Sequence, residues 1–256
     1  MNTYTATTLL SYHAPQLKSV ELFAVTSIGE NAFAFCQELE SVSFGTRIKT
    51  IPTGAFNLCT SLENISLGGV QVIGENAFAQ TAFKSINLTG VKEVGKYAFV
   101  ECENLTSVVL DSNGCKIEEG AFAYCENLEN VENLNKVTYV GDYSFSYTAI
   151  TKADLSSAEY IGTSAFMKDK LTNFELTITS ALKDIGDNPF AYCKIGKFSS
   201  IETVEFNGKT YETPVFTYNL NDNIIVDSSI LLRSFITNIF KKRINNTSVF
   251  VVFIHF

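Results

Sequence analysis

Apolar residues recur along the chain at a nearly constant interval. The pattern aliphatic–Gly–x–x–Ala–Phe, or a close variant, occurs eight times, and "IGENAF" is spelled identically at residues 28 and 73. Successive closing phenylalanines are separated by 21 to 24 residues. A period in this range is the length of one coil of a stacked repeat solenoid. The phenylalanines are Phe33, Phe56, Phe78, Phe99, Phe122, Phe145, Phe166 and Phe190.

A second apolar block follows in most units. It reads Leu-x-x-Val-x-Leu or a variant, as in "LESVSF" at 39, "LENISL" at 62, "LTSVVL" at 105 and "LTNFEL" at 171. Alternation of this kind predicts a short strand whose last two apolar residues point inward and whose intervening residue points outward. The outward residues form one row, coil by coil: Glu21, Ser43, Ser66, Asn87, Val109, Glu132, Asp154 and Glu175.

The first block has its own physical logic. One coil cannot bury its apolar edge alone, so equivalent positions must stack on the next coil. The Gly after the aliphatic residue predicts a turn that a β-carbon would crowd. We expect "ENAFAFC" to form one or two helical turns with Ala and Phe facing inward.

Together these blocks resemble the BspA-like leucine-rich repeats of bacterial and protist surface proteins. The likeness rests on "IGENAFAFCQELESVSF" and extends over roughly residues 17–200. It implies an α/β repeat solenoid, a right-handed leucine-rich-repeat array of eight to nine coils. A parallel β-sheet would form one face, with short helical or irregular turns on the other. It also implies a secreted or cell-surface protein, although "MNTYTATTLLSYHAPQ" does not read as a signal peptide.

The segments outside the repeats suggest four parts. We expect an N-terminal cap over 1–16, the solenoid over 17–200, a C-terminal hairpin cap over 201–227 and a tail over 228–256. Asn207-Gly208 between two β-prone runs indicates a two-residue hairpin turn. The tail carries a net charge of +4 and is compatible with a membrane-surface segment, a piece of a larger domain or an irregular chain end.

Charge and chemistry exclude several function classes. The net charge of −8 argues against nucleic-acid binding, which needs clustered Lys and Arg. His13 and His255 lie outside the repeats, and neither a P-loop nor a G-x-S-x-G motif is present. No apolar stretch reaches the ~18–20 residues that would span a bilayer. We therefore predict a non-enzymatic protein without metal, cofactor or membrane span.

Five of the six cysteines follow a repeat phenylalanine by three residues, where other coils carry Thr81, Thr148 or Asp169. Such a site predicts a small buried residue with a free thiol, because disulfide geometry fits parallel neighbouring coils poorly. Disulfides are the less favoured alternative. Cys115 is out of phase, in an expected turn, and is predicted to be accessible. The five are Cys36, Cys59, Cys102, Cys125 and Cys193.

The outward row predicts where a partner would bind. Protein recognition through the strand face is the favoured function, and the resemblance to BspA-like repeats implies that it serves adhesion or host interaction. A spacer array without a dedicated ligand is the alternative. Glu132, Asp154 and Glu175 are expected to form an acidic stripe on consecutive coils. The stripe would be either a solvated surface or a docking patch for a basic protein segment or a weak Ca²⁺ site.

Overall fold

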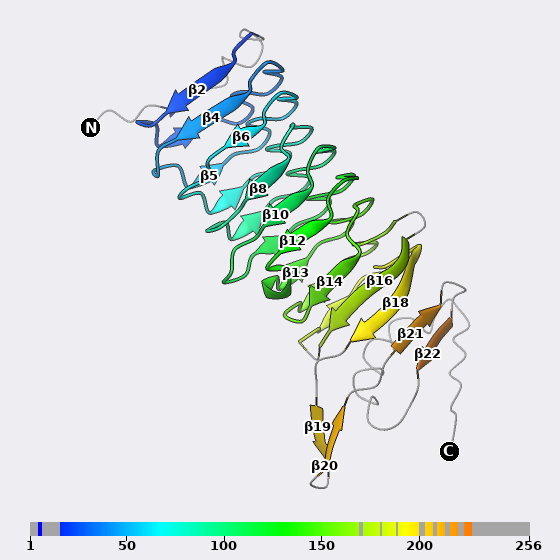
Figure 1. The fold of residues 1–256 in the computed structure, drawn as a ribbon. Helices are drawn as coiled ribbons and strands as arrows, with labels where there is room; N and C mark the ends of the chain where they lie inside the picture. Colours follow the sequence, from blue (N-terminus) through cyan, green and yellow to red (C-terminus); the bar gives the residue numbers. More distant parts are fainter. Residues whose placement is uncertain are drawn as a thin grey trace.

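The chain forms an elongated array of stacked coils, seen in the computed structural model shown in Figure 1. The structure describes residues 5–6, 16–168, 171–179, 181–187, 189–199, 203–206, 209–212, 216–219 and 223–226. Almost every strand in the array pairs in parallel with the equivalent strand of the neighbouring coil. This is a parallel-strand β-solenoid of about seven turns, consistent with a leucine-rich repeat.

The Leu-x-x-Val-x-Leu blocks form the strands of one face. These strands are grouped into three separate sheets of three parallel strands each. The first contains β2 (Ser19–Leu22), β4 (Ser41–Phe44) and β6 (Asn64–Ile65), the second β8 (Ser85–Asn87), β10 (Ser107–Val109) and β12 (Asn130–Glu132), and the third β14 (Lys152–Leu155), β16 (Leu171–Ile178) and β18 (Cys193–Ser199).

A continuous sheet of seven strands runs along another side of the solenoid. It is called the second sheet below, because the three short sheets together form the first face. Each of its seven parallel strands is two residues long and ends in a buried or half-buried aliphatic residue. The strands are β5 (Thr50–Ile51), β7 (Val72–Ile73), β9 (Glu93–Val94), β11 (Lys116–Ile117), β13 (Tyr139–Val140), β15 (Tyr160–Ile161) and β17 (Asp184–Ile185). Before it, β3 (Ser27–Ile28) pairs with β1 (Thr5–Ala6).

The expected helical turns are not confirmed. Among the described residues the only helix is the short 3₁₀ turn η1 (Leu134–Lys136). The segment after each strand of the second sheet is irregular, and in most coils it carries two residues with positive φ, such as Asn31 at 54° and Phe35 at 64°. The N–H groups of Asn31, Phe33 and Phe35 donate to carbonyls of the next coil instead of closing a helix. Hydrogen bonds between stacked coils therefore satisfy backbone N–H groups that a helix would satisfy by its own internal hydrogen bonds.

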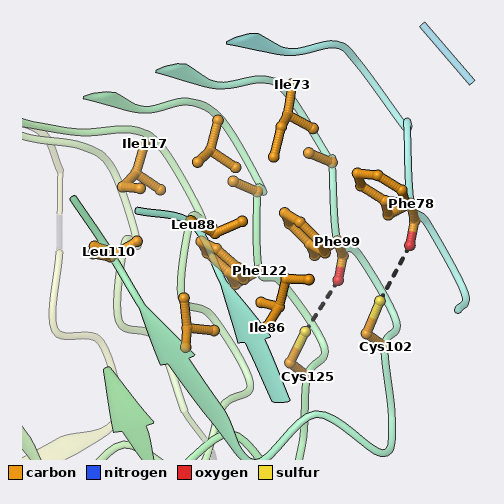
Figure 2. Close-up of a cluster of buried hydrophobic side chains, with 14 of the residues drawn as sticks. Ile73, Phe78, Ile86, Leu88, Phe99, Cys102, Leu110, Ile117, Phe122 and Cys125 are labelled. Carbon is orange, nitrogen blue, oxygen red and sulfur yellow. Dashed lines mark hydrogen bonds between the residues drawn. The ribbon is translucent and has the colours of Figure 1, made fainter. Parts of the chain in front are cut away.

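The core consists of ladders of identical side chains, as the repeat predicts. The eight repeat phenylalanines are buried and stack in one unbroken series, with ring centroids 5.2–5.5 Å apart. Their seven intervals correspond to about seven turns, so the larger estimate of eight to nine coils is not confirmed. Figure 2 shows Phe78, Phe99 and Phe122 in this series beside Ile73, Ile86 and Leu88.

The repeat-phased cysteines form a buried ladder of free thiols, as predicted. Cys102 donates from Sγ to the carbonyl oxygen of Phe78 at 3.2 Å, and Cys125 donates to that of Phe99 at 3.0 Å (Figure 2). Thr81 occupies the same position in its own coil and is also buried, with its hydroxyl bound to the Phe78 carbonyl at 3.0 Å. The position therefore needs a small side chain that can donate a hydrogen bond. Asp169 lies outside the described residues.

The prediction that Cys115 is accessible is wrong. Only 5% of this residue is exposed, and it belongs to the same core cluster as Val91 and Val137, which precede neighbouring strands of the second sheet. Gly114, at φ +91°, turns the backbone just before the cysteine and allows the thiol to face inward. Burial, assisted by the charge of Asp111, raises the pKa of Cys115 to about 11.

The glycine of the repeated phrase is required by the closeness of adjacent coils. A β-carbon on Gly141 would lie 2.6 Å from the backbone of Glu118 and Glu119, and one on Gly74 would lie 2.7 Å from the backbone of Pro52 and Thr53. Neither glycine has a positive φ, so close approach, not backbone conformation, excludes a side chain here.

Beyond the solenoid the structure describes two antiparallel strand pairs. β19 (Thr203–Phe206) pairs with β20 (Lys209–Glu212) so that Phe206 lies opposite Lys209, leaving Asn207 and Gly208 between the paired residues. β21 (Phe216–Asn219), which contacts β18, pairs with β22 (Asn223–Val226). The domain limits stay predictions, as do the caps. The tail over 228–256 lies outside the described residues.

Candidate functional site

Seven of the eight predicted outward residues lie on the strands of the three short sheets, and Ser66 directly follows β6. None of the eight is buried. Glu21, Ser66, Asn87 and Glu132 are exposed, and the other four are partly exposed. Their inward neighbours belong to the core, as Ile86 and Val108 illustrate. Alternation along each strand therefore separates a packed side from a side available to a partner.

Strand pairing aligns part of the row as expected. Glu21 lies in register with Ser43, and Val109 lies in register with Asn87 on one side and Glu132 on the other. Neighbouring members of these pairs therefore stand beside one another along the solenoid. Side chains in such positions can contact a single ligand at the same time.

The predicted adjacency of Asp154 and Glu175 is wrong. Asp154 pairs in register with Thr177, whereas Glu175 pairs with Lys152, whose Nζ lies 3.8 Å from its carboxylate. The register places Leu176 beside Ala153, and both are buried. On β16 the inward residue paired with Ala153 is therefore Leu176, two residues later in the chain than Phe174, which the Leu-x-x-Val-x-Leu pattern suggests.

The acidic stripe is interrupted at a second point. Glu132 on β12 and Asp154 on β14 belong to different sheets, because no ladder joins these two strands. Between them the chain forms η1 after Asn133, whose φ is 63°. The three acids therefore do not form one continuous ladder. Among the described residues, no group of three or more His, Cys, Asp or Glu side chains is arranged to hold a metal ion.

Two members of the row also shape their own backbone. Asn87 accepts a hydrogen bond at Oδ1 from the N–H of Thr89 at 2.9 Å, and Asp154 accepts one from Ser156 at 3.1 Å. Both are local bonds to the residue two positions later, typical of Asx turns. Alternation along the strand marks these side chains only as surface groups. The signal that could have revealed the turn is an Asn or Asp one residue before the strand's final leucine.

Asp111 is a buried carboxylate that the outward row does not include. It accepts hydrogen bonds from the N–H of Gly90 at 2.8 Å and of Asn113 at 2.9 Å, and its Oδ1 lies 2.6 Å from Lys92 Nζ. These donors, led by Lys92, lower the pKa of Asp111 to about 2. The carboxylate ties two coils together beside Cys115. Its bonds are all internal, so it acts in structure rather than in ligand contact.

The described part of the chain contains no helix long and apolar enough to cross a membrane. This finding concerns helical spans alone.

Comparison with known proteins identifies similar chains. A leucine-rich repeat protein from Bacteroides ovatus is 26% identical, with a TM-score of 0.48, over 72% of this chain and 55% of that one. The T. pallidum leucine-rich repeat protein is 32% identical, with a TM-score of 0.53, over 56% of this chain and 69% of that one. This chain thus spans about half the length of the B. ovatus protein. No curated protein matches it.

The model of the BspA type leucine rich repeat region matches in six copies, over residues 11–105 and 92–212. These matches cover more than half of the chain and include the stacked phenylalanines and the strands of both sheets. The repeat pattern, the parallel solenoid and this match lead to one conclusion: the chain belongs to the BspA-type leucine-rich repeat family, whose repeats support protein interaction or a repeat scaffold.

Proposed function

We propose that this protein is a non-enzymatic recognition module that binds a protein ligand through the strand face of its solenoid. The observation that carries the proposal is the outward row, which lies on nearly every coil and has no place in the core. A ligand could contact several coils at once, because adjacent strands in a sheet lie ~4.8 Å apart. Family membership favours a cell-surface or secreted setting, in adhesion or host interaction.

Rigidity of the core supports this proposal. The phenylalanine ladder and the inter-coil hydrogen bonds fix the spacing of the outward residues before any ligand arrives. A preorganised surface loses little conformational freedom on binding. A protein ligand is also the type of partner that the extended surface of a repeat solenoid accommodates.

A second candidate function is a spacer in a larger surface assembly. It is favoured by the breaks between the three short sheets and by the turn-forming bonds of Asn87 and Asp154, which account for two of the row's polar residues. In that case the row is a solvated surface and no dedicated ligand exists.

One experiment separates the two functions. The immobilised full chain is exposed to host extracellular-matrix proteins and, separately, to envelope proteins of its own cell. Captured proteins are identified, purified and titrated directly. A strand-face variant, Ser66→Arg with Val109→Arg, is compared with Thr50→Arg, an exposed control on β5 of the second sheet.

Recognition by the strand face predicts saturable binding of a purified protein that the strand-face variant weakens at least about tenfold and Thr50→Arg leaves unchanged. Saturable binding that both variants retain would remove the strand face as the site. Absence of any saturable ligand in both pools would favour the spacer function.

A further inference from the structure

A group of tyrosines lies on the outer side of the continuous seven-stranded sheet, away from the predicted row. Tyr139 and Tyr160 stand in register on β13 and β15, and their rings stack with centroids 4.8 Å apart. Tyr143, in the turn after β13, is 41% exposed, and Tyr97 occupies the equivalent turn two coils earlier. Tyrosines of this kind combine a flat apolar surface with a polar tip and are enriched in protein interfaces.

Carboxylates surround these rings. The hydroxyl of Tyr160 donates to Asp142 Oδ1 at 3.2 Å, and the same oxygen accepts the N–H of Thr163 at 2.7 Å. The hydroxyl of Tyr97 donates to Glu119, which also pairs with Lys96 Nζ at 2.9 Å. A donating phenol positions a carboxylate without neutralising it, so the negative charge stays at the surface.

The electrostatics of the tyrosines agree with this arrangement. Burial and the charge of Asp142 raise the pKa of Tyr160 to about 12. Burial, followed by the charges of Glu118 and Asp142, also raises the pKa of Tyr139, and Lys96 opposes this effect. Lys116 lies in register beside Tyr139. Within the part of the chain that the structure describes, neither Glu118 nor Asp142 forms an ion pair with Lys116 or with another basic residue.

We propose that this tyrosine surface, formed by Tyr97, Tyr139, Tyr143 and Tyr160 with Glu118 and Asp142, binds an arginine-bearing protein segment. The guanidinium group is the one side chain that both stacks on an aromatic ring and pairs with a carboxylate through two parallel hydrogen bonds. The inference rests on the proposed role in protein recognition but assigns contact to a different sheet. Charge complementarity selects the occupant, because an acidic segment would be repelled.

The chain offers a matched control for the stacked pair. Tyr124 and Tyr147 also stack, with centroids 4.8 Å apart, but they lie in the turns after the repeat phenylalanines and outside the tyrosine surface. Equivalent positions in other coils supply replacements that the fold already accepts. Thr50 corresponds to Tyr139 and Tyr160, Gln80 to Tyr124 and Tyr147, and Asn31 and Asn76 to Tyr143.

The test measures fluorescence anisotropy of the full chain with two labelled glycine–serine peptides that are identical except for several arginines or lysines. We expect the arginine peptide to bind at least about fivefold more tightly than the lysine peptide. Tyr139→Thr with Tyr160→Thr should weaken the arginine peptide about fivefold or more, whereas Tyr124→Gln with Tyr147→Gln should not. Glu118→Gln should weaken it more than Glu132→Gln, an equal charge change on the strand face.

Equal binding of the two peptides would overturn the proposal, as would equal losses from the two tyrosine pairs, since both indicate general attraction to an acidic protein. If the Tyr139 and Tyr160 double variant fails to fold, Tyr143→Asn decides the matter, because this exposed position already carries Asn in other coils. If the arginine peptide does not bind while a captured ligand depends on Ser66 and Val109, the tyrosine surface is refuted and the strand-face function stays intact.

Discussion

The ring of Phe99 lies parallel to the ring of Phe122, with centroids 5.2 Å apart and 3° between the ring planes. Both side chains are fully buried, and each also stacks on a phenylalanine of its other neighbouring coil. The stability of the central coils therefore depends on contacts between equivalent residues. In a solenoid such nearest-neighbour contacts are the main source of cooperativity.

Truncation in the middle of this ladder should be costly. Phe122→Ala removes a ring packed on both sides, and we expect the free energy of unfolding to fall by about 3–5 kcal/mol, as for other buried cavities. Phe33→Ala should cost less, because coils near an end can open independently of the rest. Denaturant unfolding followed by circular dichroism measures both values. Equal losses would contradict a solenoid that opens from its ends.

Ser144 should be a stabilising target. It occupies the repeat position that is Ala in coils such as those of Ala121 and Ala165, and its Oγ is buried without a hydrogen-bond partner. Ser144→Ala should raise the free energy of unfolding by about 1 kcal/mol, since it removes an unsatisfied hydroxyl. The reverse change, Ala121→Ser, should lower stability by a similar amount. Thermal melts of the two variants would show shifts of opposite sign, and a loss of stability in Ser144→Ala would mean that the hydroxyl is bonded.

Cys115 should be protected in the native state. Its burial and a pKa raised to about 11 both suppress the reactive thiolate at neutral pH. A thiol reagent at pH 7 should therefore label Cys115 only as the protein unfolds, as for Cys59, whose pKa burial raises to about 12. Mass spectrometry of peptides from a time course provides the measurement. Rapid labelling of Cys115 under native conditions would show that its turn opens.

Stability should depend on pH through Asp111. Its pKa is lowered from the ordinary 3.8 to about 2, so the carboxylate stabilises the folded chain above the unfolded pKa. That contribution should be lost as the pH falls from about 4 towards 2. Asp111→Asn should lower the free energy of unfolding at pH 7 by about 1–3 kcal/mol and flatten its pH dependence in this window. If Asp111→Asn loses as much free energy of unfolding in acid as the parent does, other carboxylates cause that loss.

Gly141 should not tolerate a side chain. A β-carbon there would meet the Glu118 and Glu119 backbone at 2.6 Å, so Gly141→Ala should cost about 2–3 kcal/mol by overpacking. Gly68→Ala is the control, because its β-carbon would meet only Ser66 Oγ at 4.0 Å. Its stability should change by less than about 0.5 kcal/mol. Comparable effects in the two variants would indicate that adjacent coils can move apart.

The candidate site was only partly predictable. The positions of Glu21, Ser43, Asn87 and Val109 follow from alternation, because a short strand over a packed core has one inward side. The position of Glu175 does not follow from alternation. Phe174, Leu176 and Ile178 continue the apolar alternation, so this strand could pair with its neighbour in two registers that differ by two residues. Pairing of β16 with β14 and β18 selects between them, with a bulge near Phe174. Local pattern contains no information on that choice.

By itself the sequence determined the stacked phenylalanines, the small thiol-bearing position and the glycines at close approach. Each of these depends on contact between identical sites, so repetition of the letters specifies the contact. Tertiary structure alone decided the inward turn of Cys115, the left-handed residues in place of helical turns and the gathering of Tyr139, Tyr143 and Tyr160 beside Asp142. The inward turn of Cys115 and the gathering of the tyrosines depend on non-repeated residues, which only the stacking of the coils brings together. The left-handed residues recur in most coils, but the hydrogen bonds that replace those of a helix come from the next coil, so the local pattern does not reveal them.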